Sequence, residues 1–216
     1  MTRTASIAMW HNMFPGKIAG SVYAVPVSER ARAARELADG DLDVHVDVMA
    51  VDEGLPTGVA IEELRDIAAA VDATRIGVQL IGSTTFVDAV LTEVLVTRPA
   101  KVFLPWHAFT AERVSAVRAA GSAAWIALWT EWDGHGVPRW PTPPDGALVM
   151  LIEPGTSGPC LLSRLAIVAA CAAELPVNVD GGVTEDVAPL CLTAGAESIV
   201  VGRALLAPAA RERKAI

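Results

Sequence analysis

The chain of 216 residues is poor in lysine and cysteine, and each scarcity excludes a class of protein. Only Lys17, Lys101 and Lys214 are lysines, and the formal net charge is −8, so we expect no basic surface and no nucleic-acid partner. The three cysteines are an odd number without a CxxC spacing. That pattern argues against a disulfide framework and against a thiolate zinc site.

Long hydrophobic runs are also missing. No apolar stretch reaches the roughly 18 residues that a membrane-spanning helix requires, and the chain does not begin with a signal-like segment. We therefore expect a soluble, cytoplasmic protein with no membrane partner. The hydrophobic fraction of 52% and the charged fraction of 19% supply a sizeable core and exclude a disordered chain.

Short β-branched runs alternate with amphipathic stretches, which is typical of repeated βα units and a parallel sheet. We expect strands at 17–23, 43–49, 75–80, 101–104, 124–128, 147–152, 177–180 and 198–201. Helical patterns lie between them at 28–38, 61–71, 85–94, 111–119, 161–173 and 184–194. The sequence therefore predicts one domain, a closed (β/α)8 barrel over 17–210.

Two regions interrupt this rhythm. Residues 1–16 precede the first strand as an N-terminal extension that could cap either end of the barrel. The segment 129–146 contains four prolines where a fifth helix should lie, and so dense a proline content is incompatible with a regular helix. We expect a loop that crosses the outside of the barrel there.

The second predicted strand carries the first candidate site. Because side chains alternate along a strand, His45, Asp47 and Met49 share one face, and the intervening valines share the face toward the helices. An imidazole and a carboxylate inside a barrel are costly unless they are paired or bind a metal. The alternatives are therefore a metal or catalytic site and a structural His–Asp pair.

The seventh predicted strand places Asn178 and Asp180 on the interior face and is followed by Gly181 and Gly182. Asp47 and Asp180 can then face each other across the barrel mouth. Two carboxylates on opposite sides of a ligand suit the inversion of a carbon acid next to a carbonyl, in which one removes a proton and the other returns it.

Glycines follow three successive late strands. Their backbone amides could form a nest for a phosphate, a site that barrels of this kind often build in these loops, although each glycine pair alone is more often a turn. The loop residues that we expect to bind substrate are Gly155, Ser157, Gly158, Gly181, Gly182, Gly202 and Arg203.

These residues together resemble the ribulose-phosphate 3-epimerase family, phosphosugar epimerases with a TIM-barrel fold. The resemblance covers about residues 17–206. The segment 45–49, His-Val-Asp-Val-Met, is similar to the family's metal-binding strand, and 154–158, Pro-Gly-Thr-Ser-Gly, resembles its phosphate loop. The segment 179–182, Val-Asp-Gly-Gly, matches the second catalytic aspartate, and Ser21 matches the active-site serine of the opening strand.

The resemblance implies a divalent metal, usually zinc, bound by His45, Asp47 and Asp180. It also implies that Asp47 and Asp180 are the acid/base pair and that Met49 and Met150 line the substrate site. The family's fourth ligand is a histidine, and Gln79 stands in its place. The alternatives are three protein ligands plus water or substrate, a harder ion such as manganese, magnesium or iron, no metal, or a ligand from His11, His107 or His135.

The sequence therefore predicts an isomerase that inverts C3 of a ketose phosphate, D-ribulose 5-phosphate or a related pentulose or hexulose phosphate. One alternative is a related phosphosugar isomerase or lyase with an altered metal or none. Another is a phosphosugar-binding barrel without catalysis. Because homo-oligomers are common in the family, we also expect a homo-oligomer.

Overall fold

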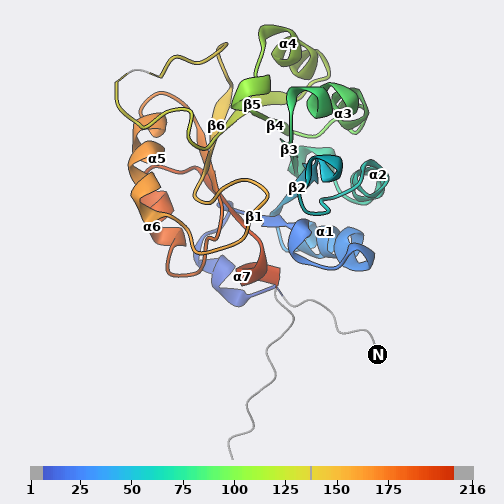
Figure 1. The fold of residues 1–216 in the computed structure, drawn as a ribbon. Coiled ribbons are helices and arrows are strands. Elements are labelled where there is room, and N and C mark those ends of the chain that lie inside the picture. The colour runs from blue at the N-terminus through green and yellow to red at the C-terminus, as the bar shows by residue number, and fades with distance from the viewer. Residues whose placement is uncertain (1–6, 137, 207–216) are drawn as a thin grey trace, which may run out of the picture.

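The computed structural model describes residues 7–136 and 138–206, and these form a closed barrel of eight parallel strands in the order β1 to β8 (Figure 1). This confirms the predicted fold. The strands are β1 (Ile18–Ser21), β2 (Asp43–Met49), β3 (Ile76–Ile81), β4 (Lys101–Pro105), β5 (Ala123–Leu128), β6 (Gly146–Met150), β7 (Val177–Asp180) and β8 (Ser198–Val201).

Side chains on the two faces of the strands form two separate cores. The outward face, exemplified by Val44, Val46 and Val48 of β2, packs in the layer between the sheet and the surrounding helices. Large apolar side chains on the inward face, Phe103, Trp125, Leu148 and Val200, come from β4, β5, β6 and β8. Polar inward side chains are concentrated on the other strands, which positions the site described below.

The helices surround the barrel (Figure 1). They are α1 (Arg30–Asp39), α2 (Ile61–Ala70), α3 (Thr84–Val96), α4 (Ala111–Ala119), α5 (Leu165–Ala172), α6 (Ala188–Thr193) and α7 (Arg203–Leu206). Of those in the described part of the chain, none is long and apolar enough to cross a membrane.

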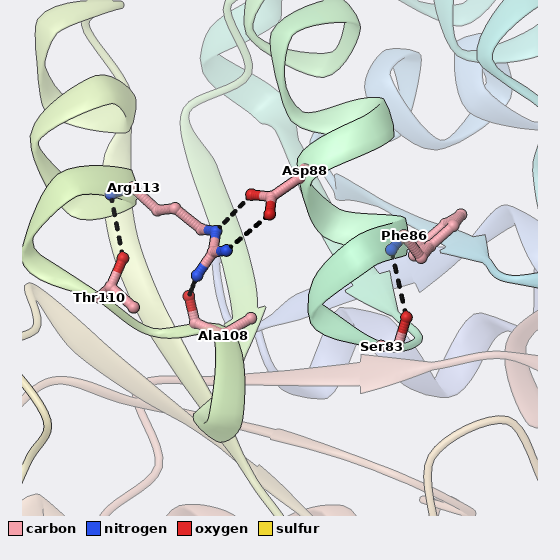
Figure 2. Close-up of polar contacts among 6 residues, drawn as sticks. All are labelled: Ser83, Phe86, Asp88, Ala108, Thr110 and Arg113. Carbon is pink, nitrogen blue, oxygen red and sulfur yellow. Dashed lines mark hydrogen bonds and ion pairs between the residues drawn. The ribbon is translucent and has the colours of Figure 1, made fainter.

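Side-chain caps fix the starts of two outer helices (Figure 2). Ser83 accepts a hydrogen bond from the Phe86 N–H at the start of α3, and Thr110 accepts one from the Arg113 N–H at the start of α4. The Arg113 guanidinium then pairs with Asp88 of α3 at 2.8 Å. These contacts join neighbouring βα units on the outside of the barrel.

Several predicted boundaries were wrong where the chain turns at the mouth of the barrel. The first strand ends at Ser21, and the next three residues form a 3-10 turn. The helix predicted at 161–173 begins only at Leu165, after a 3-10 turn over Leu162–Arg164, and the Arg164 guanidinium donates to the Met150 carbonyl and ties that turn to β6. The helix predicted at 184–194 spans only Ala188–Thr193.

The two irregular regions lie outside the barrel. Apart from residue 137, which the structure does not describe, the segment 129–145 contains no helix, as the prolines predicted. Trp140 packs between Trp106 and Trp132, with ring centroids 5.5 and 6.0 Å away. Trp10 of the N-terminal segment donates a hydrogen bond to the Ala204 carbonyl, so the described part of this segment packs against α7.

Candidate functional site

Strands β1 and β2 bring Ser21, His45 and Asp47 together inside the barrel. Ser21 lies opposite His45 in the register of the two strands. The Ser21 hydroxyl donates to Asp47 Oδ2 at 2.7 Å, and His45 Nε2 lies 3.3 Å from Asp47 Oδ1. Both oxygens of the buried Asp47 carboxylate are therefore held by neighbouring polar groups, which fixes its orientation.

Asp180 reaches the same point from β7, across the barrel. Ligand atoms of His45, Asp47 and Asp180 all lie within 4.8 Å of one another. One imidazole nitrogen and two carboxylates so close together form a donor set that fits a divalent cation. These are three of the residues for which the sequence predicted metal binding.

Burial and charge separate the proton affinities of this cluster. Burial raises the pKa of Asp180 to about 7, and the Asp47 charge adds to the effect although His45 opposes it. Burial acts against the charged form of His45, but the charges and hydrogen bonds around it prevail and raise its pKa to about 9. Burial also opposes ionisation of Asp47, yet His45 and Ser21 outweigh it and lower the Asp47 pKa.

Gln79 lies beside Asp47 in the register of β2 and β3. Its Oε1 is 3.1 Å from His45 Nε2, and its Nε2 donates to Met150 Sδ at 3.5 Å. Gln79 Oε1 therefore faces His45 Nε2, the nitrogen that would bind a metal. With Gln79 included, the donor set is one nitrogen and three oxygen ligands, a composition that harder divalent ions also accept.

The other histidines considered as substitutes lie elsewhere in the described chain. His107 Nε2 contacts the Gly82 carbonyl at 3.0 Å, and His11 Nδ1 contacts the Ala8 carbonyl at 2.8 Å. His135 is in the outer loop between β5 and β6. None of the three belongs to the cluster of potential ligands around His45.

A cavity of about 510 Å³ opens at the carboxyl ends of the strands, where barrels of this class place their active sites. Asp47 and Asp180 line it, and so does every residue for which the sequence predicted substrate binding. These are Ser21, Met49, Met150, Gly155, Ser157, Gly158, Gly181, Gly182, Gly202 and Arg203.

The cavity also contains polar residues that the sequence analysis did not select, including Tyr23, Glu153 and Thr184. Tyr23 follows the first strand, and Glu153 directly precedes the Pro-Gly of the sixth-strand loop. Their positions shortly after a predicted strand are a sequence signal that could have identified both Tyr23 and Glu153. Among the described residues that line the cavity, the charged side chains are those of Asp47, Glu153, Asp180 and Arg203, so Arg203 is the single cation of this set.

Two glycines let the loops after β6 and β7 meet backbone to backbone. Gly181 has φ +115°, and a Cβ there would lie 2.7 Å from the Ile152 nitrogen. Gly182 has φ +68°, and its Cβ would lie 2.8 Å from the Gly158 carbonyl oxygen. Any side chain at these positions would push the two loops apart. The glycine pair therefore sets the shape of the cavity wall.

Arg30 anchors the loop after β2, a role that sequence alone did not reveal. Its guanidinium donates to the Gly58 carbonyl at 2.8 Å and pairs with Glu63 at 3.0 Å, although Arg30 is only 4% exposed. Earlier in this loop, Leu55 approaches Gly155, where a Cβ would lie 2.9 Å from Leu55 Cδ2. The loops after β2 and β6 thus meet beside the cavity.

Comparisons with known proteins agree with this architecture. The sequence model of the ribulose-phosphate 3 epimerase family matches residues 17–206. No curated protein matches the sequence. Among solved structures, phosphoribosyl anthranilate isomerase from Thermus thermophilus has a TM-score of 0.60 at 15% identity, with 87% of this chain and 88% of that chain covered.

Two further solved structures show the same fold. Phosphoribosyl anthranilate isomerase from Thermococcus kodakaraensis has a TM-score of 0.59 at 12% identity over 88% of this chain and 89% of that one. Orotidine 5'-monophosphate decarboxylase from Sulfolobus solfataricus has a TM-score of 0.56 at 12% identity over 87% and 88%. At such low identity these likenesses concern the barrel alone.

Proposed function

Because the chain belongs to the ribulose-phosphate 3-epimerase family, we propose that it inverts C3 of a ketose phosphate, with Asp47 and Asp180 as the acid/base pair. The candidate substrates are D-ribulose 5-phosphate and related pentulose or hexulose phosphates. The observation that carries the proposal is the pair of carboxylates that line one cavity, the buried Asp47 of β2 and the partly buried Asp180 of β7.

The two aspartates supply the proton transfers. One carboxylate removes the proton from C3, next to the C2 carbonyl, and the electron pair of the broken C–H bond moves into an enediolate. The other aspartate, in its protonated form, delivers a proton to the opposite face of C3, which regenerates the ketone with inverted configuration. Their pKa values support the division, because the lowered pKa of Asp47 favours its ionised form, whereas a pKa of about 7 lets Asp180 populate both its protonated and its ionised form near neutral pH.

Other residues prepare this step. Ser21 holds Asp47 by a hydrogen bond, and Met49 and Met150 offer soft apolar contacts to a flat intermediate. His45, Asp47 and Asp180, with Gln79 beside them, would hold a divalent ion, such as zinc, manganese, magnesium or iron. When bound, such an ion would offset the negative charge that develops on the sugar oxygens.

The glycine loops that line the cavity suit the phosphate. Gly155, Gly158, Gly181, Gly182 and Gly202 line it without side chains, so backbone amides can approach an anion closely. Arg203 adds a guanidinium that can make charge-assisted hydrogen bonds to phosphate oxygens. The proposed ligand therefore lies with its phosphate at these loops and C3 between the two aspartates.

Proton NMR in deuterium oxide tests the reaction. We expect D-ribulose 5-phosphate or D-fructose 6-phosphate to gain deuterium at C3 and to yield the 3-epimer, with and without zinc or manganese as separate arms. Asp47→Asn and Asp180→Asn should abolish exchange, whereas Asp186→Asn, at an exposed position after β7, serves as the control.

The alternatives give different results in the same experiment. Exchange accompanied by a different product would indicate another enediolate reaction, an isomerisation or a cleavage. Binding of the ketose phosphate without exchange would indicate a phosphosugar-binding barrel. The replacement of the family's histidine by Gln79 is the observation that favours these alternatives.

A further inference from the structure

Tyr23 lines the large cavity, but the proton transfers proposed above give it no role. It is the only tyrosine of the chain, and it lies in the 3-10 turn over Val22–Ala24 that follows β1. Its side chain is half-buried. Among the residues that the structure describes, none forms a hydrogen bond with the Tyr23 hydroxyl, and its oxygen is not one of the buried unpaired polar atoms. This donor is therefore available to a ligand in the cavity.

The turn that carries Tyr23 runs between two parts of the cavity. Just before the turn, Ser21 donates to Asp47 Oδ2 at 2.7 Å, which places the start of the turn beside the proposed acid/base pair. At the end of the turn, Ala24 lies against the loop after β8, because a Cβ on Gly202 would lie 3.4 Å from Ala24 Cβ. Tyr23 therefore lies between the carboxylate proposed to act at C3 and a loop proposed to hold the phosphate.

A buried cation lies over the Tyr23 ring. The guanidinium carbon of Arg30 is 5.9 Å from the ring centroid, which is within the range of a cation–π contact. Such a contact stabilises more when the cation is removed from water, and Arg30 is buried. The ring is therefore held on one face by a desolvated guanidinium.

This guanidinium is itself held by fixed partners. It donates to the Gly58 carbonyl at 2.8 Å and pairs with Glu63 at 3.0 Å. The Glu63 carboxylate also accepts from the Ala60 N–H at 2.8 Å, at the start of α2. Gly58 packs so closely on β2 that a Cβ there would lie 2.7 Å from the Asp47 carbonyl oxygen. Arg30 is therefore fixed relative to β2, and it fixes the aromatic ring beside it.

We propose that Tyr23 is a substrate-binding residue whose hydroxyl donates a hydrogen bond to the sugar chain between C3 and the phosphate, and that Arg30 is its positioning residue. In D-ribulose 5-phosphate the acceptor is the C4 hydroxyl oxygen. The inference rests on the proposed function in taking a ketose phosphate as the ligand of this cavity. A phenol is a rigid donor, so it selects a sugar by the placement of one hydroxyl at little cost in conformational entropy.

Calorimetric titration of wild-type protein and Tyr23→Phe, both purified without chelators, tests the contact. The probes are D-ribulose 5-phosphate, D-fructose 6-phosphate and inorganic phosphate, and phenylalanine keeps the ring while removing only the hydroxyl. We expect the Kd of the ketose phosphates to rise roughly 3- to 10-fold, the effect of one hydrogen bond, and that of inorganic phosphate to change less than about twofold. An equal loss for inorganic phosphate would place the hydroxyl at the phosphate and overturn the assignment to the sugar chain.

The ring provides a second measurement. Because the chain has one tyrosine, protein labelled with 13C-tyrosine gives a single set of ring cross-peaks in its NMR spectrum. A ketose phosphate at saturation should shift the Tyr23 cross-peaks, and inorganic phosphate should shift them less. Calorimetric binding that leaves these cross-peaks unchanged, with the same Kd in Tyr23→Phe, would overturn the inference.

Arg30→Met and Arg30→Lys test the positioning role, with Arg32→Met as the control. Arg32 belongs to the same helix, but its side chain is 33% exposed and pairs with Glu29 at 3.1 Å. Arg30→Met removes the cation over the Tyr23 ring, so the cross-peaks of the ligand-free protein should shift and the Kd of the ketose phosphates should rise. Arg30→Lys retains a cation and should recover most of the affinity, and Arg32→Met should match wild type.

Arg30→Lys also covers the case in which Arg30→Met does not fold. An ammonium lacks the planar fork of a guanidinium, so the Tyr23 cross-peaks should still move in Arg30→Lys. Cross-peaks and ketose phosphate affinity identical to those of wild type in every folded Arg30 variant would refute the positioning role.

The outcomes separate this inference from the proposed function. A ketose phosphate that binds with the expected dependence on Tyr23 but gains no deuterium at C3 would refute the epimerisation and leave this inference standing. Exchange at C3 with the same KM in wild type and Tyr23→Phe would do the reverse. Failure of both ketose phosphates to bind would refute both.

Discussion

The barrel interior has two chemically different sets of strands, its apolar side (β4, β5, β6 and β8) and its polar side (β1, β2, β3 and β7), although β8 pairs with β7 and β1. Strands β4, β5, β6 and β8 point apolar side chains inward, among them Phe103, Trp125 and Leu148. Strands β1, β2, β3 and β7 point Ser21, His45, Asp47, Gln79, Asn178 and Asp180 into the same space. The apolar side stabilises the barrel by burial, and the polar side bears the desolvation of charged groups that a reaction requires.

This difference predicts which substitutions affect stability and which affect activity. The largest effect on stability is expected on the apolar side. Phe103→Ala should lower the free energy of unfolding by about 3–5 kcal/mol, because the fully buried ring would leave a cavity against Trp125. Urea denaturation followed by tryptophan fluorescence measures this. A loss below about 1 kcal/mol would contradict this expectation, because the apolar side would then contribute no more to the free energy of unfolding than the polar side.

On the polar side the expected effect is on rate. Asp180→Asn should reduce kcat by about 10³-fold, because it removes a proton donor and acceptor from the floor of the cavity. Its free energy of unfolding should not fall, since an amide carries no charge to desolvate. The coupled measurement is single-turnover deuterium exchange and urea denaturation on the same preparation. A variant with full activity would remove Asp180 from the mechanism.

The pH dependence of stability sharpens the comparison further. The folded-state pKa of His45 is raised from 6.5 to about 9, so its contribution is fully present below pH 6.5 and is lost as the pH rises through 9. In protein stripped of divalent ions, the free energy of unfolding should fall by up to about 3 kcal/mol across this window.

Asp180 acts in the same direction at lower pH. Its pKa is raised from 3.8 to about 7, so its protonated form stabilises the fold most below pH 3.8, and that contribution is lost as the pH rises through 7. Urea denaturation at intervals from pH 6 to 10 in EDTA measures the His45 effect. His45→Gln should flatten the curve above pH 7, and an equally steep curve in that variant would assign the effect to another group.

The smallest expected effect concerns Gln79. Gln79→His restores an imidazole beside His45 and Asp47, so zinc should bind about 10-fold more tightly if this side chain reaches the ion. Chelator competition measures the affinity, and manganese provides a comparison because its binding should gain less. Equal zinc affinity in the two proteins would place Gln79 outside the ligand set.

Much of this contrast was predictable from local patterns. The alternation of His45 and Asp47 with valines identified an inward polar face on β2, because side chains in a strand alternate strictly between faces. Glycines after the last three strands identified the loops that line the cavity, because a run of glycines directly after a strand is also a local sequence pattern. The resemblance to the family joined these separate patterns, and the match over residues 17–206 confirms it.

Other features depended on contacts between distant residues. The α5 helix begins only at Leu165, and the turn before it is held by the Arg164 hydrogen bond to the Met150 carbonyl, a contact that no helical periodicity encodes. In the sequence, nothing distinguishes Arg30 from other charged residues at the start of a helix. In the structure it is buried and holds the loop after β2. Asn178 was recognised as inward-facing, but the small cavity that it lines together with His45 exists only in the closed barrel.

The sequence by itself determined the strand and helix alternation, the inward faces of β2 and β7 and the glycine loops, because each follows from spacing along a few residues. Only the tertiary structure decided that Asp47 and Asp180 meet with His45, that Gln79 turns its oxygen toward His45, and that His45 lines a second, smaller cavity. Closure of the barrel is the physical reason. It brings strands far apart in the chain to one axis, and the resulting distances and burial depend on all eight strands together.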